Sequence, residues 1–145
     1  MQVKQILCEK GREIVALLSE ATLSDAARLL AHKRIGALVV RDRTGALVGI
    51  LSERDVVRAV AEEGVSALAR PVSATMTRNV ATCTELDTVQ ELMEMMTQGR
   101  FRHVPVLDGN GQMCGLVSIG DVVKMHIEET MREAASLRQY ITAAG

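Results

Sequence analysis

Two segments of this 145-residue chain carry a glycine, a serine and an aspartate at the same spacing: Gly49–Asp55 reads GILSERD and Gly115–Asp121 reads GLVSIGD. A serine three residues before a carboxylate at a helix start is typical of a capping box. The same groups also suit an adenosine phosphate. A helix N-terminus can hold phosphate, a carboxylate can bind a ribose diol, and glycine permits close approach to the backbone. Both interpretations are open at this stage.

The two segments belong to an internal repeat, and a repeat of this kind decides the fold. A shift of 66 positions places Ile35–Arg58 on Phe101–Lys124 without a gap, and eight of the 24 pairs are identical. The aligned glycine, serine and aspartate therefore occupy equivalent places in two copies of one structure.

Each copy is expected to contain a helix, two strands joined by a tight turn, and a second helix. In the first copy these are Ser24–Lys33, Ala37–Val40, the turn Asp42–Gly45, Leu47–Leu51 and Glu53–Glu63, the last ended by Gly64 as a left-handed cap. In the second copy they are Thr88–Gln98, Val104–Leu107, the turn Asp108–Gly111 and Met113–Val117. The Asp-to-Gly spacing suits a type I turn, although Gly109-Asn110 permits other types. Short additional strands are expected near Ile14–Ala16 and Val80–Thr82.

A single copy of about 60 residues buries too little surface to be stable alone. We therefore expect an α+β fold in which two strand-helix-strand-strand-helix repeats pack through their sheets. The expected boundaries are residues 1–66 for repeat 1, 67–71 for a linker, 72–130 for repeat 2 and 131–145 for a helical extension.

The composition argues against several classes of protein. The net charge is −1 and the chain has one Phe, one Tyr and no Trp, so the basic and aromatic surface of a nucleic-acid reader is not expected. No apolar run approaches the ~20 residues of a membrane span, and the N-terminus does not resemble a signal peptide. The three scattered cysteines favour neither a disulfide framework nor a metal site. These features predict a protein of the reducing cytoplasm.

Several other residues have ordinary structural interpretations. Methionines 93, 95 and 96 are expected to fill the core. His32 and His126 lack partners at metal-binding spacing, and Asp108–Gly111 lacks the glutamate of a calcium loop. Arg54 could reach a phosphate or simply be solvated.

The last helix is expected to run from Asp121 to about Ile141, well beyond the repeat. Apolar residues recur along it every three or four positions, which predicts a stripe on one face. They are Val123, Ile127, Met131, Ala134, Leu137 and Ile141. The stripe could pack on its own module or serve self-association.

The combination of GILSERD and GLVSIGD with IGALVV, FRHVPV and MTRNV resembles a tandem pair of cystathionine-β-synthase (CBS) domains over about Val3–Glu128. It is similar to small stand-alone bacterial members. The resemblance implies pseudo-two-fold symmetry, disc-like homodimers and two clefts between the sheets, each joining the Ser/Asp turn of one copy to the lead-in segment and first strand of the other.

The resemblance also implies which residues would bind the nucleotide. Cleft one would contain Ser52, Arg54, Asp55, Met76, Thr77, Val80, Ala81, Arg102 and His103. Cleft two would contain Lys10, Gly11, Ile14, Val15, Gly36, Ala37, Ser118 and Asp121. The aspartates would hold ribose, and serine and basic side chains would hold phosphate. Because charge-assisted hydrogen bonds are the stronger ones, the Arg102–His103 pair predicts that cleft one binds more tightly.

We therefore expect a non-catalytic regulatory module that binds AMP, ADP, ATP or NAD(H) as a homodimer and acts on a protein partner that the sequence does not identify. No metal or catalytic cofactor is expected, and no repeated nucleophile–base pair indicates an enzyme. The alternative is a ligand-free interaction or dimerisation module.

Overall fold

The computed structural model describes residues 1–144, which form two compact units. The first-repeat unit is Ile14–Val80. The second-repeat unit combines Met1–Glu13 with the chain from Ala81 onward. The units thus differ from the sequence repeats at their edges, because the first 13 residues join the second repeat and the chain after Pro71 stays with the first.

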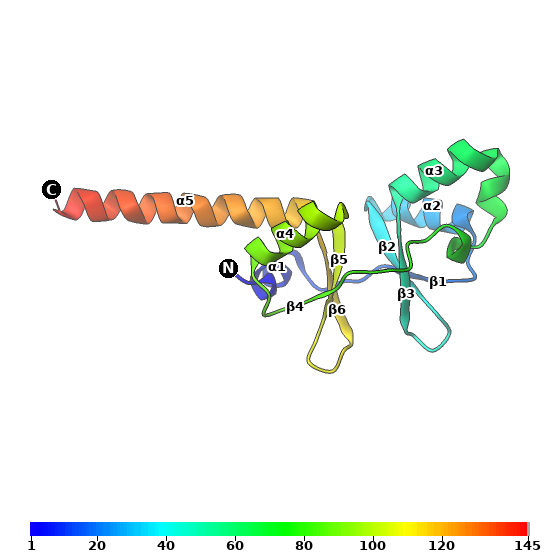
Figure 1. The fold of residues 1–145 in the computed structure, drawn as a ribbon, viewed down its shortest axis with the longest axis horizontal. Coiled ribbons are helices and arrows are strands. Elements are labelled where there is room, and N and C mark those ends of the chain that lie inside the picture. Colours follow the sequence, from blue (N-terminus) through cyan, green and yellow to red (C-terminus); the bar gives the residue numbers. More distant parts are fainter. Residues whose placement is uncertain (145) are drawn as a thin grey trace. The chain divides into compact units, whose positions relative to one another are not determined.

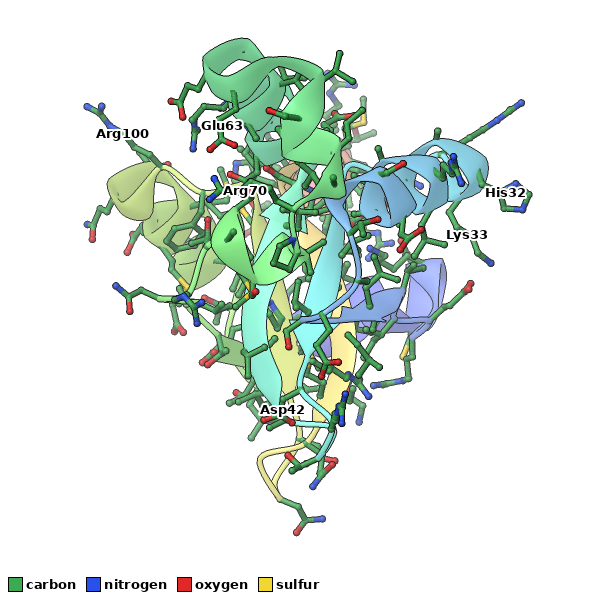
Figure 2. All side chains as sticks on the ribbon, turned by 90° about the vertical axis from the view of Figure 1, so that its right-hand side faces the viewer. His32, Lys33, Asp42, Glu63, Arg70 and Arg100 are labelled. Carbon is green, nitrogen blue, oxygen red and sulfur yellow. The ribbon has the colours of Figure 1, made fainter. Side chains whose placement is uncertain are left out.

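The first-repeat unit contains a three-stranded sheet of order β1-β2-β3, with β1 parallel and β3 antiparallel to β2 (Figure 1). Its elements are β1 (Ala16–Leu18), α2 (Leu23–Lys33), β2 (Ala37–Arg41), β3 (Leu47–Ser52), α3 (Glu53–Glu63), and the 3-10 helices η1 (Gly64–Ala69) and η2 (Val72–Ala74). An ion pair of 2.5 Å between Glu63 and Arg70 joins the end of α3 to the residue after η1 (Figure 2).

The second-repeat unit has the same sheet, in the order β4-β5-β6. Its elements are α1 (Val3–Lys10), β4 (Cys83–Thr84), α4 (Val89–Gly99), β5 (His103–Leu107), β6 (Met113–Ser118) and α5 (Ile119–Ala144). Ala37 pairs with Ser52 in one hairpin and His103 with Ser118 in the other. The 66-residue offset therefore holds for strand register, and the α+β fold of two repeats is confirmed.

Each unit has its own apolar core between its sheet and helices. In α4 the buried residues Val89, Leu92 and Met96 follow helical spacing. Met93 and Met95 pack against the same cluster, so the methionines fill the core as predicted. His32 is exposed near the end of α2 (Figure 2), and no group of His, Cys, Asp or Glu within residues 1–144 could hold a metal ion.

The hairpin turns form as predicted. The Asp42 carboxylate accepts hydrogen bonds from the Thr44 and Ala46 amides, and the Thr44 hydroxyl together with these amides lowers the pKa of Asp42. Asp108 accepts the equivalent bonds from Asn110 and Gln112. These bonds hold each loop as a local turn.

Some elements differ from the sequence predictions. The short strands begin at Ala16 and Cys83, later than predicted, and each pairs with the middle strand of its own sheet. Gly64 has φ 73° and ψ −159°, which is not a left-handed helical cap, because the chain continues directly into η1. Ala67, at the start of the expected linker, is buried in the first-repeat core. Helix α1 was not foreseen, although Val3, Ile6 and Leu7 supply its buried face.

No helix within residues 1–144 is long and apolar enough to cross a membrane. Helix α5 extends through 26 residues and ends three residues beyond the predicted Ile141.

Candidate functional site

The turn between β3 and α3 is a complete capping box. The Ser52 amide and hydroxyl both donate to Asp55 Oδ2, at 2.9 and 3.1 Å, and the Asp55 amide donates to Ser52 Oγ at 3.3 Å. Asp55 is only 7% exposed and is the buried charged residue of the described chain. The donors that replace water around this buried carboxylate therefore come from Ser52, at the start of the same helix.

The turn between β6 and α5 repeats this arrangement. The Ser118 amide donates to Asp121 Oδ2 at 2.9 Å, and the Asp121 amide donates to Ser118 Oγ at 3.2 Å. The interpretation of Ser-x-x-Asp as a capping box is therefore confirmed in both copies.

The first backbone amide of each helix is also engaged. The Glu53 amide donates to the Gly36 carbonyl at 2.9 Å, and the Ile119 amide donates to the Arg102 carbonyl at 2.8 Å. The expectation that these helix starts offer free amides to a phosphate is wrong for the N-cap, N1 and N3 amides, since each already has an acceptor within its own unit. A phosphate at these turns would therefore have fewer backbone donors than an open helix start offers and would depend more on side chains.

The glycine that precedes each turn is needed for close packing. A Cβ on Gly49 would lie 2.6 Å from Met76 Sδ and 2.9 Å from the Thr77 carbonyl oxygen. A Cβ on Gly115 would lie 2.6 Å from Leu7 Cδ2. Contacts under 3.0 Å force a neighbour to move, so both glycines admit a crossing segment, as their spacing predicted.

The two crossing segments contact their sheets differently. Thr77 pairs with Ile50 through backbone hydrogen bonds of 2.9 and 3.0 Å. In the other unit the repeat-equivalent of Ile50 is Leu116, and its carbonyl accepts a hydrogen bond of 2.8 Å from Lys10 Nζ. Lys10 Nζ also lies 2.6 Å from Asp121 Oδ2. The carboxylate of the second turn thus already forms an ion pair with a lysine of its own unit.

The charge environment of the two aspartates differs accordingly. Burial acts to raise the pKa of Asp121, but the hydrogen bonds from Lys10 and Ser118 outweigh it, and the pKa is lowered overall. The cation beside Asp55 is Arg58, whose Nη1 lies 3.5 Å from Asp55 Oδ1. The Arg58 side chain is 66% exposed, so water screens its ion pair with Asp55 and the interaction is weak. Arg58 is not among the residues that the sequence predicted for the site, although its position three residues after Asp55 on a helix could have indicated it.

The predicted cleft residues divide between the units. Of cleft one, the first-repeat unit contains Ser52, Arg54, Asp55, Met76, Thr77 and Val80, and the second-repeat unit contains Ala81, Arg102 and His103. Of cleft two, the second-repeat unit contains Lys10, Gly11, Ser118 and Asp121, and the first-repeat unit contains Ile14, Val15, Gly36 and Ala37. Each predicted cleft therefore draws its residues from both units, and the joining of its two halves stays a prediction.

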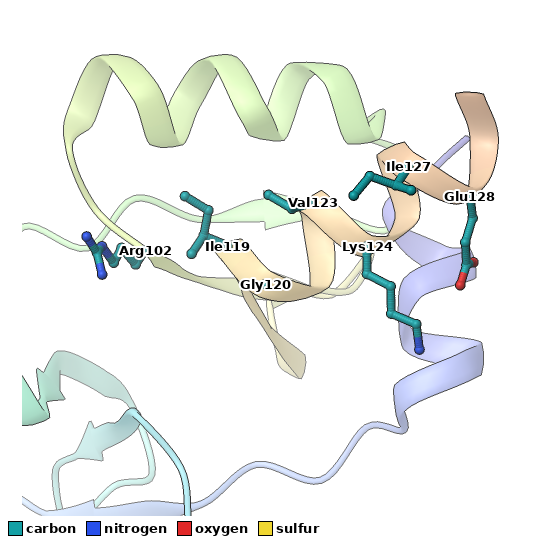
Figure 3. Close-up of a pocket in the computed structure, with 7 residues that line it drawn as sticks. All are labelled: Arg102, Ile119, Gly120, Val123, Lys124, Ile127 and Glu128. Atoms are coloured by element: carbon teal, nitrogen blue, oxygen red, sulfur yellow. The ribbon is translucent and has the colours of Figure 1, made fainter. Parts of the chain in front are cut away.

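Two arginines that were predicted to bind phosphate, Arg54 and Arg102, lie at different places in the fold. Arg54 is exposed on the first turn of α3. Strand β5 begins at His103, so Arg102 lies just before it, and the Arg102 side chain borders a hollow on α5 (Figure 3).

Two equivalent hairpins, each followed by a capped helix start that carries a carboxylate, define a tandem-repeat module. The sequence matches the CBS domain over residues 3–62 and 70–128. The chain belongs to the CBS-domain family, and its two repeats form a CBS-domain pair.

Solved structures of other CBS pairs have the same fold. A CBS-domain protein, ATU1752 from Agrobacterium tumefaciens, is 48% identical with a TM-score of 0.82, covering 85% of this chain and 91% of that one. PAE2072 from Pyrobaculum aerophilum, solved with AMP, is 32% identical with a TM-score of 0.75, covering 83% and 89%. The pair of protein MJ0100, solved with 5′-methylthioadenosine and S-adenosyl-L-methionine, is 27% identical with a TM-score of 0.78, covering 89% and 98%.

Proposed function

We propose that this chain is a non-catalytic sensor that binds an adenosine nucleotide. The observation that carries the proposal is the pair of identically built turns, in which Ser52 with Asp55 and Ser118 with Asp121 hold a carboxylate at a helix start. Relatives of this chain are solved with AMP, methylthioadenosine and S-adenosylmethionine. Adenosine is the part common to these ligands, so AMP, ADP, ATP and NAD(H) are the candidate ligands.

In cleft one we assign the ribose to Asp55. Its Oδ2 is used by the cap, while Oδ1 makes the long contact of 3.5 Å to Arg58 Nη1. A carboxylate oxygen can accept more than one hydrogen bond, and bonds to a charge withdrawn from water are strong. Arg102 and His103 would supply the phosphate contacts, with Met76, Thr77, Val80 and Ala81 beside the adenine. This joining of two half-sites stays a prediction.

In cleft two Lys10 competes with the ligand. Its ammonium group already neutralises Asp121 and bonds the Leu116 carbonyl. A ribose would have to share or displace these bonds, and Gly36 and Ala37 offer no cationic side chain for phosphate. We therefore propose that cleft one is filled first and that Lys10 weakens cleft two.

A nucleotide regulates only if it binds two states of the protein with different affinity. We propose that the sensor is a cytoplasmic homodimer and that ligand binding biases how it meets a regulated protein. An assembly module without a ligand is the second candidate, favoured by the exposed apolar residues along α5.

The test is thermal unfolding with AMP, ADP, ATP and NADH, with inorganic phosphate as the control ligand. A ligand at 100 times its Kd stabilises by about 2.7 kcal/mol, so at least one nucleotide should raise Tm by several degrees. The increase should disappear in Asp55→Ala and persist in Glu53→Ala, which removes an exposed carboxylate from the same first turn. No shift with any nucleotide would favour the assembly module.

A further inference from the structure

Only the first part of helix α5 packs against the core of its own unit. Val122 and Met125 are buried where α5 packs against α1 and α4. From Thr130 to Ala143 every residue is exposed. Figure 1 shows α5 continuing beyond α1 and α4. An isolated helix of this length is marginal in water, so the projecting part gains little stability from its own unit.

The opposite face of α5 stays apolar to its end. Ile127, Leu137 and Ile141 are 51%, 60% and 61% exposed. Near the start of α5, Ile119, Val123 and Ile127 line a shallow hollow of about 730 Å³ bordered by Arg102, Lys124 and Glu128 (Figure 3). Apolar side chains therefore recur along this face as far as Ile141, with Thr130 among them, and the face points away from the buried Val122 and Met125.

This face follows a heptad spacing from Val123 to Ile141, which is a little under three heptads. With Ile127 at position a, the a and d positions are Val123, Ile127, Thr130, Ala134, Leu137 and Ile141. The buried Val122 and Met125 fall at c and f, on the opposite side of the helix. A seam at a and d can thus bind a partner while c and f keep their packing on α1 and α4.

We propose that α5 of a second copy of this chain covers this face as a parallel two-stranded coiled coil. β-branched residues at a with Leu at d favour parallel dimers, and here Ile127 and Ile141 occupy a and Leu137 occupies d. The inference deepens the homodimer of the proposed function and rests on it.

Charge determines the direction of the pairing. In a parallel coil a residue at g faces the e position of the following heptad on its partner. Glu133 is at g and Arg138, five residues later, is at e, so two symmetric pairs of opposite charge form. In an antiparallel coil, g faces g and e faces e. Lys124 and Arg138, both at e, would then face each other and repel. Glu133, at g, would face a g position that carries no lysine or arginine.

Disulfide trapping tests the arrangement directly. In a background of Cys8→Ser and Cys114→Ser, the remaining Cys83 is buried and its pKa is raised to about 12 by that burial, so it stays protonated. Thr130→Cys and Leu137→Cys, made separately and oxidised with copper–phenanthroline, should each yield disulfide-linked dimers. Gln139→Cys, at an exposed f position, should form them at least tenfold more slowly. An antiparallel pair can bring at most one of residues 130 and 137 opposite its own copy.

A dimer linked at only one of the two positions, or at 139 as readily as at 137, contradicts the proposal, as does the absence of linkage at both.

Sedimentation gives an independent measurement of the dimer Kd. Glu133→Lys should raise the dimer Kd at least fivefold, and adding Arg138→Glu should restore it; failure of the restoration also contradicts the proposal. Loss of nucleotide binding with intact linkage at 130 and 137 would instead refute the sensor function alone.

Discussion

Lys10 Nζ bonds Asp121 Oδ2 at 2.6 Å, whereas the repeat-equivalent Asp55 has its nearest cation, Arg58 Nη1, at 3.5 Å on its other oxygen. The two turns are alike in backbone and cap, yet one carboxylate is neutralised by a segment of its own unit. The two copies of this motif therefore place their carboxylates in unequal charge environments.

The Lys10–Asp121 pair should make stability depend on pH. The folded pKa of Asp121 is lowered, and an unfolded Asp titrates near 3.9. The pair therefore stabilises the fold above about pH 4, and this contribution is lost as the pH falls through the lowered folded pKa.

Lys10→Met should reduce the free energy of unfolding by about 0.5–1 kcal/mol at pH 7, because the partly exposed pair is screened by water. Urea unfolding from pH 7 to pH 2.5 should show this difference shrinking below pH 4. Lys4→Met, on the same helix and exposed, is the control. A difference that grew on acidification would contradict the assigned sign.

The caps should contribute equally in both copies. Ser52→Ala and Ser118→Ala each remove the oxygen that accepts the N3 amide, which costs about 1 kcal/mol. Ser136→Ala, at an exposed position of α5, should cost nothing. Urea unfolding of the three variants measures this, and a neutral Ser118→Ala would mean that the second cap is not formed in solution.

The glycines should differ in their tolerance of a methyl group. Gly49→Ala places Cβ against the Thr77 carbonyl, which is backbone and cannot rotate away, so we expect a loss of about 1–3 kcal/mol. Gly115→Ala meets only the end of the Leu7 side chain and should cost less. Gly109→Ala meets nothing within 4 Å and serves as the control. Calorimetric unfolding that ranked Gly115→Ala as the costlier change would contradict the packing.

Removal of the Lys10 ammonium group should strengthen AMP binding in cleft two. In Lys10→Met the Asp121 carboxylate is no longer neutralised, so the number of AMP molecules bound per chain should rise from about one toward two in calorimetric titration. Lys4→Met should leave the number unchanged. A fall in binding in Lys10→Met would show that Lys10 holds phosphate instead of excluding the ligand.

The repeat itself made most of the fold predictable. Identical residues at an offset of 66 placed the hairpins and the Ser/Asp turns within a residue or two. Periodicity also placed the core methionines, because Met96 falls in step with Val89 and Leu92.

Features that depend on contacts distant in sequence were harder to predict. The Lys10–Asp121 bond joins residues separated by 111 positions, and no local pattern indicates it. Helix α1 is short and mixed in composition, and it is stabilised by burying Val3, Ile6 and Leu7 in the second-repeat core. The use of the N1 amides by the Gly36 and Arg102 carbonyls likewise depends on tertiary structure.

The assignment of cleft one as the main nucleotide site is tested most directly by calorimetric titration of AMP into the wild-type chain, Asp55→Asn and Asp121→Asn. Both substitutions keep the side-chain shape and remove the charge that would hold the ribose. We predict one dominant site in the wild type, weakened 10- to 100-fold in Asp55→Asn and changed less than threefold in Asp121→Asn. Binding that survives in Asp55→Asn and is lost in Asp121→Asn, or no binding by the wild type, would contradict this assignment.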